Sequence, residues 1–227
     1  MDTTDKGTVR RRPVRRRTLL RSVPVLATLV AVAACSGVPG LYVVERAGQA
    51  AAGPAKFDAT TYVDGIWDSK VVPTVTAGAV PADKLLPALR KDQKTASTTY
   101  GRQSGSGAPY AFMVKGTGKV TEVDENGAVG TLRVNVPGAG SDINLAIGPA
   151  FVGTAIRDVV GLDFSQFTNQ LDYADAATAL NAKVKNTVVD KIDLRSVKGK
   201  KVTFTGAFSV LDPSSVLVTP VTLEVAA

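Results

Sequence analysis

Eight polar residues outside the regularly patterned parts of the chain have side chains of the kind that hold small polar ligands. They are Arg102, Ser104, Arg157, Asp158, Asn169, Gln170, Tyr173 and Asp175. Guanidinium, amide, hydroxyl and carboxylate groups that are fixed in place donate and accept the hydrogen bonds that orient a sugar or a similar molecule. These residues are therefore the candidate ligand-binding set.

A second interpretation gives the same residues a structural role. Arg157 and Asp158 would then pair with neighbouring groups, and Asp175 would cap a helix. Asn169 and Gln170 would satisfy backbone groups of an irregular loop. Loops inside compact domains require such bonds, which favours the structural interpretation for the set as a whole.

Hydrolysis by paired carboxylates is a catalytic chemistry to consider, because Asp158, Asp163, Asp172 and Asp175 lie close together in the chain. No spacing singles out a pair, and aspartates are common at helix starts. A nucleophilic serine with a lysine as base lacks anything in the sequence that fixes the two groups together. We therefore assign no catalytic residue and favour a protein that is not an enzyme. A carboxylate-dependent hydrolase of the cell envelope stays as an alternative.

The chain contains one cysteine, Cys35, and no histidine. Internal disulfides, cysteine-based zinc sites and Ser-His-Asp triads are therefore excluded, and we predict no metal and no cofactor. A single cysteine in an exported protein is typical of an intermolecular bond, a free thiol or a modified residue. The position of Cys35 decides among these.

A basic segment followed by an apolar segment predicts an export signal at residues 1–34. Eight of the 27 Lys and Arg residues lie in the first 21 positions, and an apolar stretch follows up to Cys35. The tetrapeptide Val32-Ala33-Ala34-Cys35 resembles a bacterial lipobox, which predicts that Cys35 is lipidated. Arg16-Arg17 resembles a twin-arginine export motif. Residues 35–56 then form the membrane anchor and spacer.

An uncleaved leader is the alternative, since residues 23–44 are almost uncharged and long enough to cross a bilayer of about 30 Å as a single transmembrane helix. Positive charge stays on the inner side, so both interpretations place the body at the outer face of the cytoplasmic membrane, in a periplasmic or extracytoplasmic space. The leader also holds most of the formal net charge of +7, which leaves the body nearly neutral. We therefore predict no nucleic-acid partner.

Two helices are predicted in residues 57–100, the helical lead-in. Asp58 is placed to cap the first, whose apolar residues recur at helical spacing until Pro73 disturbs the pattern. The second spans residues 82–91, with Pro87 at a kink or an edge.

Residues 101–227 are predicted to form an OB-like barrel of five strands in the order β-β-β-α-β-β, so the fold class is α+β and mainly β. Apolar and polar residues alternate in 112–120, 129–136 and 143–147, and Asn126-Gly127 suits a hairpin turn. A helical pattern covers 174–189. Alternation returns in 201–210 and 216–225, where Pro220 indicates an edge or a bulge.

The body resembles the bacterial family of predicted periplasmic lipoproteins that carry domain of unknown function 2291. The resemblance covers Phe57 to Glu224 and rests on these segments: Ile66-Trp67-Asp68-Ser69-Lys70-Val71-Val72-Pro73, Tyr100-Gly101-Arg102, Ser104-Gly105, Pro109-Tyr110, Val114-Lys115-Gly116, Gly153-Thr154-Ala155-Ile156-Arg157-Asp158, Phe167-Thr168-Asn169-Gln170, Tyr173-Ala174-Asp175, Ala179-Leu180-Asn181 and Phe204-Thr205-Gly206-Ala207-Phe208.

The resemblance implies an envelope protein with a barrel related to the OB fold and with genes often beside sugar-importing ABC transporters. It implies no activity. The family often has an acidic turn between the second and third strands, and residues 137–142 lack those carboxylates apart from Asp142, which argues against calcium there.

We therefore expect a non-enzymatic, lipid-anchored protein that assists sugar uptake. It would do so by docking on ABC transporter components or by holding a small polar ligand. A purely structural envelope protein is a further alternative.

Overall fold

The computed structural model describes residues 56–210 and 216–226. The predicted export signal, the predicted lipidation site Cys35 and the spacer up to residue 55 lie outside the described residues. Within the described ranges, no helix is both long enough and apolar enough to cross a membrane.

Five strands close into a barrel because each of them pairs with a strand on both sides. Their order around the barrel is β3 (Ala111–Asp124), β4 (Val129–Asn135), β5 (Ile143–Pro149), β7 (Leu217–Val225) and β6 (Lys201–Ser209). β6 returns to β3 as an antiparallel partner and closes the ring. β5 and β7 are parallel, and a long helix lies between β5 and β6 in the chain. The predicted OB-like barrel with the order β-β-β-α-β-β is confirmed.

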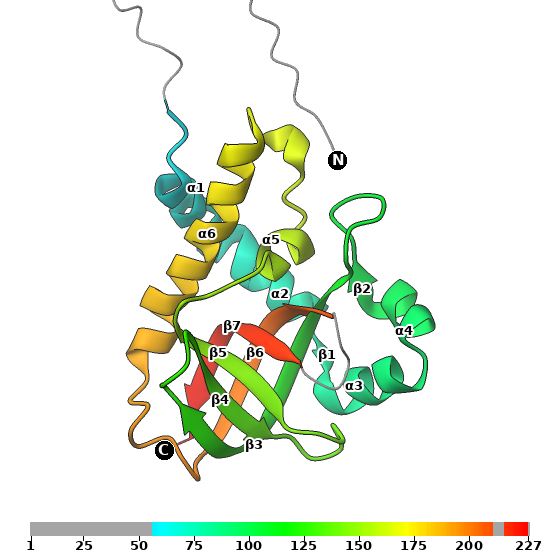
Figure 1. Ribbon diagram of the computed structural model, residues 1–227, viewed down its shortest axis with the longest axis vertical. Helices are drawn as coiled ribbons and strands as arrows, with labels where there is room; N and C mark the ends of the chain where they lie inside the picture. Colours follow the sequence, from blue (N-terminus) through cyan, green and yellow to red (C-terminus); the bar gives the residue numbers. More distant parts are fainter. Residues whose placement is uncertain (1–55, 211–215, 227) are drawn as a thin grey trace, which may run out of the picture. The chain divides into compact units, whose positions relative to one another are not determined.

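Helices precede the barrel and also stand between β5 and β6. In chain order they are α1 (Ala59–Ile66), the π-helical turn η1 (Trp67–Val71), α2 (Val72–Gly78), α3 (Ala82–Lys91), α4 (Gln93–Tyr100), α5 (Ala155–Val159), the 3-10 turn η2 (Phe164–Gln166), α6 (Gln170–Thr187) and the 3-10 turn η3 (Val189–Lys191). Two short strands, β1 (Val80–Pro81) and β2 (Gly101–Arg102), pair with β3. In Figure 1, α1 lies beside α6 on one side of the molecule, and α3 and α4 lie on the other.

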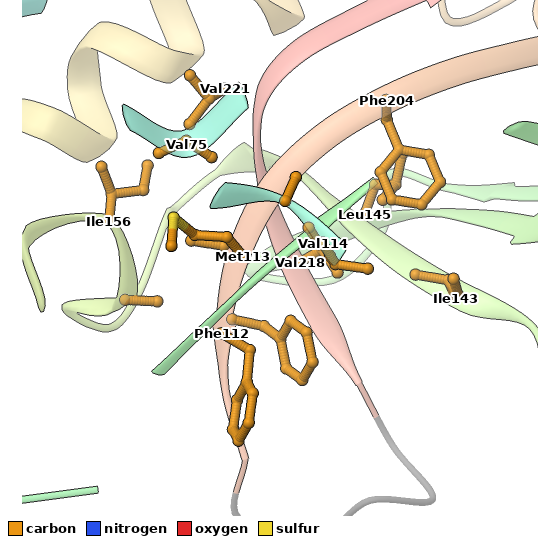
Figure 2. Close-up of a cluster of buried hydrophobic side chains, with 14 of the residues drawn as sticks. Val75, Phe112, Met113, Val114, Ile143, Leu145, Ile156, Phe204, Val218 and Val221 are labelled. Carbon is orange, nitrogen blue, oxygen red and sulfur yellow. The ribbon is translucent and has the colours of Figure 1, made fainter. Parts of the chain in front are cut away.

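β3 carries apolar side chains on both of its faces, which gives the barrel an inner core and a second core under the helices. Val114 gathers with Leu145 inside the barrel, and both are buried (Figure 2). Its neighbour Met113 points to the other face, beside Val75 of α2 and Ile156 of α5 (Figure 2). Successive residues of a strand face opposite sides, so one strand serves both cores.

The lead-in helices confirm the predicted cap and the predicted second helix. The Asp58 carboxylate accepts hydrogen bonds from the backbone N–H groups of Thr60 and Thr61 at 3.0 Å each. α3 spans residues 82–91, as the apolar pattern predicts, and Pro87 stands inside it. The chain stays helical past Pro73, which is the second residue of α2 and follows the π-helical turn η1 directly. A π-helical turn is one of the interruptions with which a helix continues past such a residue.

Other boundaries differ from the sequence patterns. α6 begins at Gln170, four residues before the predicted start, because Asn169 caps it by accepting from the N–H of Asp172. α4 has no counterpart in the predictions, since its sequence QKTASTTY carries no apolar stripe. The bulge indicated by Pro220 is confirmed by a shift in register between β6 and β7 at this residue.

Candidate functional site

A buried ion pair forms the centre of the candidate site. Arg157 donates from Nε and Nη2 to the same carboxylate oxygen of Asp158, at 3.0 and 2.9 Å. The other carboxylate oxygen accepts from the hydroxyl of Thr154 at 2.7 Å. The two charged side chains are only 11% and 8% exposed, so both oxygens of Asp158 have partners inside the protein. Such pairing is what a buried carboxylate requires.

Arg157 also stacks on an aromatic ring from the neighbouring helix. Its guanidinium carbon lies 3.7 Å from the centroid of the Tyr173 ring, a cation–π contact between α5 and α6. Arg102 approaches the same short helix from β2 and donates to the backbone carbonyl of Val159 at 3.1 Å. Three segments far apart in the sequence therefore meet at α5.

A chain of aromatic rings extends from Tyr173 to the start of the described body. Its members are Phe57, Tyr62, Phe164, Phe167 and Tyr173, with centroids of contacting rings 5.3 to 5.8 Å apart. All five contacts are tilted or edge-to-face, which aromatic rings prefer over a face-to-face sandwich. We call these five rings and Arg157 the arginine–aromatic cluster.

One end of this cluster presents apolar side chains to solvent. Phe164 in η2 is 43% exposed, and Leu171 in the first turn of α6 is 67% exposed. In Figure 1 the beginning of α6 and the turn before it lie at the end of the molecule where the chain enters α1. Phe164 packs on Tyr173, and Leu171 lies two residues before Tyr173 in α6. Large exposed apolar side chains of this kind are typical of an interaction surface.

The structure brings together Arg102, Arg157, Asp158 and Tyr173 and separates the other predicted ligand-binding residues from them. Asn169 caps α6, and Gln170 is the exposed first residue of that helix. Ser104 lies half-buried in the loop after β2. Asp175 is exposed and lines a separate hollow of about 610 Å³ beside residues 56–60.

The carboxylates that suggested hydrolysis are mostly engaged in local bonds. Asp158 is paired with Arg157, and Asp172 accepts from the side-chain amide of Asn169 at 3.1 Å. Asp163 starts η2, and hydrogen bonds from Ser165, with its backbone N–H foremost, hold the pKa of Asp163 below its ordinary value. A general acid at neutral pH needs a raised pKa, so Asp163 does not suit that role.

The turn between β4 and β5 serves the fold. Arg90 of α3 donates to the backbone carbonyl of Ala139, which is fully buried in this turn. Asp142 accepts from Thr121 at 3.1 Å and from Asn135 at 2.7 Å. Nowhere in residues 56–210 and 216–226 do three metal-ligating side chains gather.

Comparison with known protein families decides the classification. Residues 26–224 match the family described as predicted periplasmic lipoprotein, domain of unknown function 2291. The chain belongs to this family. The match takes in Cys35 and the described body as far as residue 224, and the family description names no activity.

One solved structure shares the fold of this family member. An OB-fold protein from Thermotoga maritima matches with a TM-score of 0.62 at 21% identity, over 75% of this chain and 99% of the other. Two OBody proteins, each bound to hen egg-white lysozyme, match with TM-scores of 0.26 at 11% and 10% identity. The match to the first of these covers 52% of this chain and 80% of the other chain. Likeness at that level carries no further argument. No curated protein matches.

The arginine–aromatic cluster contains residues that sequence reasoning missed as functional candidates. Phe57 and Phe167 contact each other at 5.6 Å, yet one begins the body and the other follows α5. Leu171 stands between the polar residues Gln170 and Asp172, which is a signal in the sequence that could have marked it, whereas nothing in the apolar pattern around Phe164 distinguishes that residue.

Proposed function

We propose that this family member is a non-enzymatic, membrane-tethered accessory protein of a sugar ABC-type uptake system. It docks on the extracytoplasmic surface of the transporter through the exposed end of the arginine–aromatic cluster. The observations that carry the proposal are the exposure of Phe164, whose ring packs on Tyr173, and the exposure of Leu171, two residues before Tyr173 in α6. Rigid aromatic and aliphatic anchors contribute most of the binding free energy in protein interfaces.

The path of the chain supports a partner at the membrane. Phe57, at the beginning of the described body, is itself a ring of the cluster. If Cys35 carries the predicted lipid, residues 36–56 connect it to this ring and span at most about 75 Å when fully extended. The cluster therefore contains the first residues of the body after the tether. A tether of this length allows the cluster to contact a partner that is embedded in the membrane.

The charges beside the exposed residues favour a protein partner over the lipid surface. Asp163 precedes Phe164, and Asp172 follows Leu171. Anionic lipid headgroups repel such carboxylates, whereas basic side chains of a protein complement them. The choice of a sugar transporter rests on the gene neighbourhoods that membership of the family implies.

Ligand binding or hydrolysis at the predicted polar set has weaker support. The guanidinium of Arg157 and both carboxylate oxygens of Asp158 already have partners. A ligand at this point would have to replace buried bonds that are made.

Site-specific crosslinking of the intact, tethered chain tests the proposal. The chain is co-expressed with a sugar ABC transporter of the same organism, and crosslinks to the transporter subunits are quantified. The double variant Phe164→Ser with Leu171→Ser is expected to lower the crosslinked fraction at least about tenfold, because two central apolar anchors are lost.

Val152→Ser is the matched control. Val152 is an equally apolar residue, 58% exposed, and it lies in the loop whose Gly153 carbonyl accepts from Asn181, near the middle of α6. This variant is expected to crosslink like the unaltered chain. Equal crosslinking of all three chains, absence of any transporter subunit, or binding of the body to protein-free anionic vesicles would each contradict the proposal.

A further inference from the structure

The edge of β3 that faces away from β6 has an interruption in its pairing. On this edge β1 pairs as far as Pro81↔Lys115, and β4 begins at Lys119↔Asn135. No described strand pairs with residues 116–118 there. In an antiparallel strand the N–H and C=O of one residue point to the same edge, and those of the next residue point to the other edge. At least one of residues 116–118 therefore directs both groups toward the open edge.

A groove of about 420 Å³ lies at this interruption, away from the arginine–aromatic cluster. Its lining is Pro81, Ala82, Asp83, Lys115, Gly116, Thr117, Val136, Pro137, Thr203 and Thr205. Figure 1 shows α3, whose first turn borders the groove, beside β1 at the edge of the barrel. Pro81 and Pro137 have no N–H, so neither can extend the ladder into the gap, and their rings form apolar walls.

The floor of the groove carries a row of hydroxyl groups. The pair Thr117 and Thr203 are hydrogen-bonded at 3.0 Å between their hydroxyls. Thr205, opposite Lys115 in the register, is only 8% exposed, and its hydroxyl makes no side-chain hydrogen bond within the described residues. A hydroxyl that lines a groove and has no side-chain partner in the protein can bond to a bound molecule.

One positive and one negative side chain stand at the groove. Asp83 is in the first turn of α3, and Lys115 is on β3. Neither forms an ion pair in the part of the chain that the structure describes, and their charges cancel within the groove. Donors and acceptors are therefore both available, while a ligand with net charge of either sign would meet one repulsive group.

The walls of the groove are held in place by contacts outside it. Gly138 has a φ of +81° and lies so close to α3 that an added Cβ would come within 3.0 Å of the Asp83 Cβ. Arg90, on the last turn of the same helix, donates to the Ala139 carbonyl. The first turn of α3 and the turn after β4 are thereby fixed to each other, which preorganises the groove.

We propose that this groove binds a small, neutral, polyhydroxylated molecule of the size of a monosaccharide or a cyclitol. Its hydroxyls would donate to Asp83 and accept from Lys115, and Thr205 would both donate and accept. The C–H faces of the ring would pack on Pro81 and Pro137. A groove of this volume is within the range of sites for small ligands. The proposal does not depend on docking to a transporter.

Isothermal titration of the full chain tests the proposal, in a polyoxyethylene detergent because maltoside and glucoside headgroups would compete. The probes are D-glucose, D-ribose and myo-inositol, with glycine, a zwitterion without net charge, and the anion inorganic phosphate as comparisons. At least one of the three neutral probes is expected to bind and to raise the thermal unfolding temperature. Thr205→Val is expected to weaken that binding about fivefold, through loss of one hydrogen bond.

Asp83→Ala is expected to weaken binding about tenfold, since a charge-assisted bond is lost. Lys115→Met is expected to weaken binding of the probe similarly, and it should fold because Lys115 is exposed. This variant replaces Thr205→Val in the test if Thr205→Val fails to fold. Thr222→Val is the matched control, because Thr222 pairs with Thr205 from β7 but does not line the groove.

The proposal is overturned if none of the neutral probes binds, if only glycine or phosphate binds, or if the groove variants bind as tightly as Thr222→Val. The docking variant, with serine at positions 164 and 171, is expected to retain binding. Failure of the ligand site and failure of the docking surface are thus separate results.

Discussion

The guanidinium carbon of Arg157 lies 3.7 Å from the centroid of the Tyr173 ring, while two of its nitrogens bond to Asp158. This one side chain joins α5 to the first turns of α6 and neutralises a carboxylate that is 8% exposed. Residues 153–158 and 173–175 belong to two of the motifs that carry the family resemblance, and this contact holds the two motifs together. It also supports the rings on which Phe164 is exposed.

Arg157→Met is expected to destabilise the protein by about 3 kcal/mol, because Asp158 is left as a buried charge without a partner. The double variant Arg157→Met with Asp158→Asn should lose less, since no unpaired charge then remains. Tyr173→Phe keeps the ring and should change stability by less than about 0.5 kcal/mol. Urea unfolding of the four chains measures these differences. A double variant that loses more than Arg157→Met would contradict this account of the pair.

The barrel could be predicted because its signals are local. Leu132, Val134 and Val136 alternate with polar residues, and the same period recurs in the other strands. The boundaries of α4 and α6 could not be predicted in this way, because Asp92 and Asn169 begin these helices by capping. Neither cap is followed at once by an apolar stripe, so the hydrophobic pattern does not mark where these helices start.

The candidate sites depend on contacts between distant segments. Arg102 meets Val159 only because β2 pairs with the beginning of β3. Thr205 faces a groove only because β1 and β4 leave a gap on β3. The sequence marks Arg102 as polar and Thr205 as part of a strand, but periodicity does not show which side chains the barrel closure brings together.

Acid should destabilise the protein through three helix-start carboxylates, Asp58, Asp92 and Asp163. Their pKa values lie below the ordinary value of 3.8, because their charged forms accept hydrogen bonds. The foremost donors are, in the same order, the Thr61 backbone N–H, the Thr95 hydroxyl and the Ser165 backbone N–H.

Because the folded-state pKa values are depressed, the unfolded chain binds more protons in acid. The stabilisation is fully present above the unfolded pKa of about 3.9 and is lost as the pH falls through the folded values. Thermal unfolding at pH 7, 5, 4 and 3 should show a decline that begins near pH 4. Replacing the three aspartates by asparagine keeps the caps and should flatten the decline. Asp68→Asn, which removes a carboxylate without hydrogen bonds in the described structure, should leave it unchanged.

Two glycines should respond in opposite ways to substitution by alanine. At Gly206, beside the β7 bulge, an added Cβ would come within 2.4 Å of the Thr219 carbonyl oxygen. Gly206→Ala must shift this backbone and is expected to cost about 2 kcal/mol. At Gly65 in α1, nothing lies within 4 Å of the added atom, and Gly65→Ala should stabilise by about 0.5 to 1 kcal/mol. Denaturant midpoints that move in the same direction would refute this difference.

The anchor at Cys35 is the prediction on which the tethered orientation depends. A diacylated cysteine carries two acyl chains, which suffice for stable membrane attachment, whereas one chain gives marginal binding. Mass spectrometry of the mature N-terminus should therefore find a diacylglyceryl group on Cys35 and no residue before it.

Cys35→Ser separates this anchor from the alternative of an uncleaved helix over residues 23–44. With the lipid as anchor, the substituted chain lacks its acyl chains and should keep the leader through Met1, because processing at the lipobox depends on the modified cysteine. With a transmembrane helix as anchor, the unaltered chain already retains Met1, and the substitution should change neither its mass pattern nor its membrane retention. The N-terminal mass of the unaltered chain therefore decides between the two, and in both cases the body lies on the same side of the membrane, because the basic residues stay inside.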